Sequence, residues 1–163
     1  MAGRGTRLAL AAALLAACTP LSRCELDEVR AHVLDYERRV AVHAAEERAL
    51  RSRIAEFDRK IFTNEKAGVD LLKAELARAT AAHARRLAAV QVRSHLLRPA
   101  HRQKVRALEE LAAAYEQLLR AYPAADFAAI RSGLAARDRA MREMEAADLA
   151  LVRLTRKYRE QHR

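Results

Sequence analysis

The chain of 163 residues has no tryptophan, four glycines and three prolines, and aromatic residues make up only 4% of it. Sheet proteins need frequent turns and aromatic or β-branched strands, so this composition argues against a β-rich fold. Few turns also mean few loops, and catalytic pockets are usually built on loops. Alanine, leucine, arginine and glutamate dominate instead, which is typical of long helices.

The sequence also lacks a nucleophile elbow, a glycine-rich phosphate loop and paired metal-binding histidines such as His-x-x-x-His. One weak metal constellation remains, made of His43, Glu47 and His83. Two histidines and a glutamate are zinc ligands, but polar residues on a helical seam more often fix its register. We therefore predict that the protein is not an enzyme, has no catalytic residue and holds no metal.

A single apolar run stands out, the ten residues from Leu8 to Ala17, preceded by Arg4 and Arg7. It is too short to cross a bilayer as a helix, which takes about 20 apolar residues. A cationic start, a short apolar core and small residues at its end are the pattern of a secretory signal.

The residues Leu15-Ala16-Ala17-Cys18 that close this run resemble the lipobox of bacterial lipoproteins. The resemblance implies that residues 1–17 are removed and that Cys18 carries a diacylglycerol and an acyl chain, with no other cofactor. By similarity to enterobacterial lipoproteins, Thr19 implies the outer membrane. Ordinary secretion, with cleavage near Ala13 or Ala17, and an uncleaved anchor remain the alternatives.

Apolar residues recur at alternating steps of three and four from Leu26 to Ile61, which predicts a long amphipathic helix with a coiled-coil seam. A capping box formed by Ser22 and Glu25 predicts that this helix begins near Arg23. Residues 18–22 would then be only a short tether between the lipid and the folded domain.

The apolar pattern slips by one residue after this helix and resumes as far as Leu97. Folding the chain about Thr63 places the two seams opposite each other. This register predicts an antiparallel helical hairpin, with helices at about residues 23–62 and 65–97. Pro99 should end the second helix, because a residue before proline avoids the helical region.

Two further helices are expected, at about residues 100–121 and 124–161, with Pro123 in the first turn of the latter. Reflection about Pro123 pairs apolar residues again, which favours a second hairpin, although a kink in one long helix would also explain the proline. The predicted fold is all-α: two antiparallel helical hairpins in a coiled-coil-like four-helix arrangement, joined at Pro99. Residues 23–163 would form one domain.

The formal net charge of +10 is unevenly spread, since residues 76–108 carry eight basic side chains and no acidic one. We predict that these residues form a patch for anions or an acidic partner, with an ordinary solvated helix face as the alternative. The eight are Arg78, Arg85, Arg86, Arg93, Arg98, Arg102, Lys104 and Arg106. A second basic amphipathic segment, from Leu149 onward, is either a bundle helix or a surface helix for a membrane or partner.

These features predict an exported, lipid-anchored scaffold protein of the bacterial envelope that works through its helical faces. Its partners would be the membrane through the lipid, a protein or second copy through the helical seams, and an anionic lipid or envelope polyanion. Export argues against nucleic acid as the ligand of the basic window. A holdase-like chaperone or carrier and a surface adhesin or antigen are the alternatives. The membrane face, the oligomeric state and the role of Cys24 stay open.

Overall fold

The computed structural model describes residues 23–160, with all their side chains except those of Ala74 and Glu160. This part of the chain is helical almost throughout and contains no strand, so the all-α prediction is confirmed. The signal segment, Cys18 and Ser22 lie outside the described residues, and the predictions about them stay predictions.

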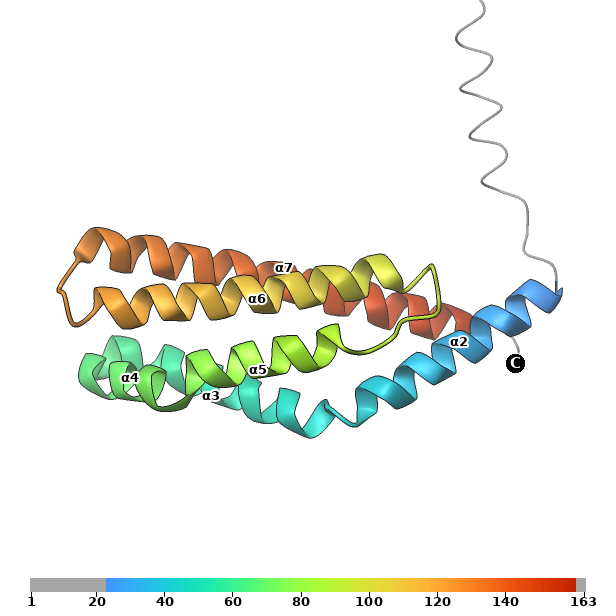
Figure 1. The fold of residues 1–163 in the computed structure, drawn as a ribbon, viewed down its shortest axis with the longest axis horizontal. Helices are drawn as coiled ribbons and strands as arrows, with labels where there is room; N and C mark the ends of the chain where they lie inside the picture. The colour runs from blue at the N-terminus through green and yellow to red at the C-terminus, as the bar shows by residue number, and fades with distance from the viewer. Residues whose placement is uncertain (1–22, 161–163) are drawn as a thin grey trace, which may run out of the picture.

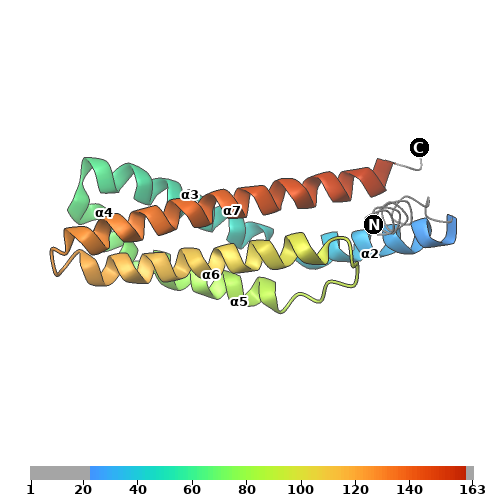
Figure 2. The ribbon, with the colours of Figure 1, turned by 90° about the horizontal axis from the view of Figure 1, so that it is seen from above.

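Six α-helices and one π-helical turn follow one another within the described residues. They are α2 (Arg23–Ala41), α3 (Ala44–Thr63), α4 (Glu65–Leu71), the π-helical turn η2 (Leu72–Leu76), α5 (Ala77–Ala88), α6 (Arg98–Ala121) and α7 (Phe127–Glu160). The α3 helix, the α4–α5 arm, α6 and α7 run alternately in opposite directions as two antiparallel hairpins (Figure 1). The remaining helix, α2, projects from this bundle and lies beside the C-terminal half of α7 (Figure 2).

Capping side chains explain two of the three turns. The Asn64 side chain accepts a hydrogen bond from the backbone N–H of Ala67 at the start of α4, at 3.1 Å. The Asp126 side chain does the same for Ala129 at the start of α7, at 2.9 Å. Because Asp126 is the stronger cap, Pro123 lies in the preceding turn, and the prediction that it begins the helix is wrong. The proline marks a true reversal of the chain.

The predicted first helix, residues 23–62, is broken at Val42 and His43. The helical backbone ends at Ala41 and restarts at Ala44, with the N–H of His43 bonded to the carbonyl of Val40 at 2.9 Å. Neither glycine nor proline marks this site. The break turns α2 away from α5 and lets its apolar face cover α7. The prediction of one continuous helix is therefore wrong, and tertiary packing is the reason.

The second predicted helix, residues 65–97, also ends early, at Ala88. Residues 89–97 form an irregular connector, and Pro99 lies in the first turn of α6 instead of ending α5. Leu97 is fully buried against α2 and α7 in this conformation. If α5 continued as a helix to Leu97, the Leu97 side chain would lie beyond this buried position. We infer that α5 ends at Ala88 because the apolar side chains of the connector are buried.

The buried apolar side chains form two cores. The larger lies within the four-helix bundle and includes Leu50, Phe57, Leu72, Leu76 and Tyr115. The predicted facing of α3 and the α4–α5 arm is thus borne out by their shared core. The smaller core joins α2 to the connector and the end of α7 through Val29, Val33, Tyr36, Leu97, Ala100, Leu151 and Tyr158.

Different elements lie at the two ends of the molecule. The start of α2, the connector and the end of α7 lie at one end, on the right in Figure 1. The α3–α4 and α6–α7 turns lie at the other. Arg23, which follows the predicted tether of residues 18–22 in the sequence, begins α2 at the first end, and we call this the tether end.

Candidate functional site

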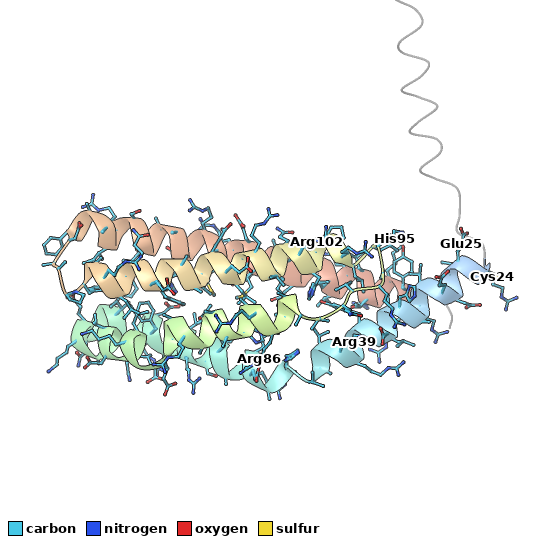
Figure 3. The ribbon with its side chains drawn as sticks, viewed as in Figure 1. Cys24, Glu25, Arg39, Arg86, His95 and Arg102 are labelled. Carbon is cyan, nitrogen blue, oxygen red and sulfur yellow. The ribbon has the colours of Figure 1, made fainter. Side chains whose placement is uncertain are left out.

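The connector and the first turns of α6 carry exposed basic side chains at the tether end, and we call this group the basic corner. Its members are Arg93, Arg98, Arg102 and Arg106. Figure 3 shows Arg102 and His95 pointing outward from this region. All four arginines were predicted as part of an anion-binding patch, and their exposure is compatible with that role.

The basic corner is held in shape by its own backbone. The guanidinium of Arg98 donates to the carbonyls of Val92 and Arg93, both at 3.4 Å. The N–H of Arg98 donates to the carbonyl of Ser94 at 3.1 Å. Arg98 is therefore partly a structural residue, and Arg93, Arg102 and Arg106 are the better candidates for an external ligand.

Three of the predicted patch residues lie apart from the basic corner, on α5. The guanidinium of Arg86 pairs with the carboxylate of Glu46 on α3 at 2.6 Å. Arg78 borders a shallow cleft together with Arg53 and Glu75. Arg85 borders another, with Glu109 and Glu116 of α6. Acidic neighbours from other helices thus interrupt the basic window, which sequence order alone could not show.

Lys104, the eighth predicted patch residue, turns into the bundle and its side chain is only 9% exposed. Its ammonium lies 2.8 Å from a carboxylate oxygen of Glu47 and 2.9 Å from one of Asp148. Arg51 also pairs with both carboxylates. We call these four residues the central charge cluster. The prediction that Lys104 belongs to an exposed basic patch is therefore wrong, because two half-buried carboxylates draw its ammonium inward.

The central charge cluster joins α3, α6 and α7 just beyond the break between α2 and α3. Burial raises the pKa of Glu47, but hydrogen bonds and attraction from Lys104 and Arg51 outweigh it, so the pKa lies below its usual value. Glu47 and Asp148 both fall on apolar seams of the sequence, which is the signal for a buried polar layer. Their partner Lys104 gave no such signal.

The two seam histidines do approach each other across the bundle. His43 and His83 each place a ring nitrogen near the same carboxylate oxygen of Glu46, at 3.9 and 3.8 Å. Glu47, predicted as the third member of this group, binds Lys104 instead. Within the described part of the chain, no three histidine, cysteine, aspartate or glutamate side chains are placed to hold a metal ion.

A second polar contact ties α2 to the bundle. His101 lies within 3.0 Å of the carbonyl of Leu87 through Nε2, and within 3.2 Å of the Tyr36 hydroxyl through Nδ1. The carbonyl can only accept, so Nε2 carries the proton and Nδ1 accepts from Tyr36. This neutral tautomer holds the end of α5, α6 and α2 together, which makes His101 structural.

Stability is expected to fall as the pH drops from about 8 to about 5, because His101 and His83 are buried as neutral rings. Burial lowers the pKa of both, and Lys104 lowers it further. A histidine with a lowered folded pKa contributes stability above its unfolded pKa of 6.5 and loses it below. Urea unfolding across this range measures the effect. A stability that does not change would contradict it, and His83→Gln with His101→Gln should flatten the slope.

A cleft of about 380 Å³ lies at the end opposite the tether end. Glu65, Lys66, Asp70, Lys73 and Tyr122 border it on α4, the π-helical turn and the α6–α7 turn. Its charged side chains alternate in sign, and none is paired with a base or nucleophile in a catalytic arrangement. We therefore assign no reaction to it.

No family model matches the chain, and neither a curated protein nor a solved structure is found to match it. Between residues 23 and 160, no helix has the length and hydropathy required to span a bilayer. Cys18, predicted to carry the lipid, lies outside the described residues. Cys24 is an exposed free thiol on the first turn of α2 (Figure 3).

Proposed function

We propose that the protein is a lipid-anchored, non-catalytic interaction module of the bacterial envelope, which contacts anionic groups through the basic corner. The observation that carries this proposal is positional. The basic corner lies at the same end of the molecule as Arg23, where the predicted tether enters (Figure 1).

The short tether gives this position its meaning. Cys18 precedes Arg23 by five residues, which span at most about 17 Å at ~3.4 Å per residue. A lipid on Cys18 would keep the tether end, and with it Arg93 and Arg102, close to headgroups and to anything bound there. Lipid headgroups and the acidic face of a membrane-bound partner share the negative charge that the corner would recognise.

The arrangement of the other polar groups supports a non-catalytic role. The central charge cluster saturates its own charges, with Lys104 and Arg51 each bonded to both carboxylates. His101 is similarly occupied by Leu87 and Tyr36. Groups bonded to one another inside a bundle fix its shape, and they have no free position for a substrate.

Cys18→Ala is expected to move the protein from the membrane fraction to the soluble fraction, because it removes the only lipidation site of the proposed motif. The wild type should carry a diacylated Cys18 as its first residue, measured as the intact mass of the membrane-extracted chain. Cys24→Ala is the matched control, since it removes an exposed thiol six residues away and should leave fractionation unchanged.

An unprocessed wild-type chain in the cytosol would contradict the proposal and return the basic corner to consideration as a nucleic-acid contact. Co-purification with one fixed partner would support the scaffold role. Suppressed aggregation of many unrelated unfolded envelope proteins would instead favour the holdase alternative, and digestion by protease added to intact cells would favour the adhesin.

A further inference from the structure

The exposed side chains of α7 have a larger excess of basic over acidic residues than the helix has as a whole. Among the α7 side chains that the structure describes as exposed, seven are basic and two, Asp138 and Glu145, are acidic. Asp148 is withdrawn into the central charge cluster, and Glu143 is partly covered. The exposed basic residues are Arg131, Arg139, Arg142, Arg153, Arg156, Lys157 and Arg159.

Three of these arginines lie in line along the helix. Arg131, Arg142 and Arg153 are separated by eleven residues each, which is close to three turns of 3.6 residues. Leu149 and Val152 lie between Arg142 and Arg153 on the same side of α7 and are 57% and 61% exposed. We call these five residues the basic face of α7. Arginines outnumber acidic residues around these two exposed apolar side chains, with Glu145, three residues after Arg142, as the acidic neighbour on this side. Exposed apolar side chains on a mainly basic helix side are the pattern of a helix that lies at a membrane surface.

The opposite side of α7 is already occupied. Leu151 and Tyr158 are buried against α2 in the smaller core. The basic face therefore points away from the rest of the described residues, and none of them covers it. Its C-terminal half lies at the tether end, beside α2 (Figures 1 and 2).

We propose that the basic face of α7 lies on an anionic lipid surface, so that the bundle rests along the membrane and does not stand on its tether end. Charge complementarity and the short chain between Cys18 and Arg23 are the reasons for choosing lipid as the occupant. The arginines would contact lipid phosphates while Leu149 and Val152 enter between the headgroups. This proposal rests on the proposed function, because it assumes a lipid anchor on Cys18. It goes further by stating how the helical domain is oriented on the membrane.

The test uses the full chain with Cys18→Ala, so that no lipid anchor contributes, and vesicles of equal parts phosphatidylglycerol and phosphatidylcholine. The chain is expected to co-sediment with these vesicles at low salt and not with phosphatidylcholine alone. Arg142→Gln with Arg153→Gln should weaken binding on the order of tenfold or more. The matched control, Arg59→Gln with Arg120→Gln, removes two exposed charges at the other end of the bundle and should weaken it less than about threefold.

Several outcomes would overturn the proposal. No binding to the anionic vesicles would reject it while leaving lipid anchoring, which fractionation tests separately, intact. If the Arg142/Arg153 variant and the control variant lost vesicle binding equally, overall charge and not the basic face of α7 would explain the binding. Loss confined to Arg93→Gln with Arg102→Gln would place lipid contact at the basic corner. Leu149→Asn with Val152→Asn should also weaken binding, and unchanged helical circular dichroism would show that each variant is folded.

Discussion

Lys104→Ala is expected to lower the free energy of unfolding by roughly 3–5 kcal/mol, the range for removing one partner of a buried ion pair. The ammonium of Lys104 bonds to Glu47 and Asp148 at 2.8–2.9 Å, and its side chain is 9% exposed. Alanine would leave two half-buried carboxylates facing each other with Arg51 as their only cation within the cluster. Urea unfolding monitored by circular dichroism measures the loss.

Lys73→Ala is the matched control, because Lys73 is an exposed lysine on the π-helical turn. Its removal should change the free energy of unfolding by about 0.5 kcal/mol or less. A second variant separates charge from packing: Lys104→Met with Glu47→Gln and Asp148→Asn removes all the buried charges except Arg51, which is 41% exposed and can reach water. We expect it to recover at least half of the loss. If Lys104→Ala cost no more than Lys73→Ala, the cluster would be solvated and would not organise the bundle.

The sequence pattern predicts the bundle well because its signal is local. Apolar residues spaced by three and four define each helix, and reflection about Thr63 correctly brings Leu50, Phe57, Leu72 and Leu76 into one core. Asn64 marks a helix start by its own side chain. Such features need only a few neighbouring residues, so they can be read without the fold.

The two helix breaks could not be predicted, because they are caused by distant contacts. Nothing near His43 or Ala88 disfavours a helix. The chain departs from the helix at these points so that Val33 and Leu97 can meet α7. A periodic pattern shows that an apolar face will be buried, but it does not show which helix will bury it.

The residues of the candidate site likewise include some that the sequence could predict and some that it could not. The exposed arginines of the basic corner could be found from charge alone, because exposure is the usual state of arginine. The inward turn of Lys104 depends on Glu47 and Asp148, which are 57 and 44 residues away in the sequence. The basic face of α7 was found only in part. The sequence marks a basic amphipathic segment from Leu149 onward, which the fold places at the end of α7. Arg131 and Arg142 were missed, because counting charges along the chain adds Asp148, which the fold removes from the surface.

Tyr115→Ala is expected to lower the free energy of unfolding by roughly 3–5 kcal/mol, as for other large buried aromatic residues. Tyr115 is fully buried at the centre of the bundle, and its ring lies edge-on to that of Phe57 with 5.6 Å between the centroids. Alanine would leave a cavity between α3 and α6 that neither helix can close without losing the other contacts of its seam. Thermal and urea unfolding both measure this effect.

Tyr115→Phe should cost less than about 1 kcal/mol, because the buried hydroxyl has no partner in good hydrogen-bond geometry, although the Arg137 guanidinium lies close enough to act against the burial that raises its pKa. Burial also raises the pKa of this phenol to about 12, so the hydroxyl is neutral near pH 7. The pair of variants thus separates the ring from its oxygen. A cost above about 1 kcal/mol for Tyr115→Phe would mean that the hydroxyl has a partner, and Arg137, whose Nε is buried and unbonded nearby, is the residue to test next. If the ring alone carries the stability, Tyr115 acts through its packing against Phe57. The polar contacts that join the helices, among them the central charge cluster and His101, would then act separately from this aromatic pair.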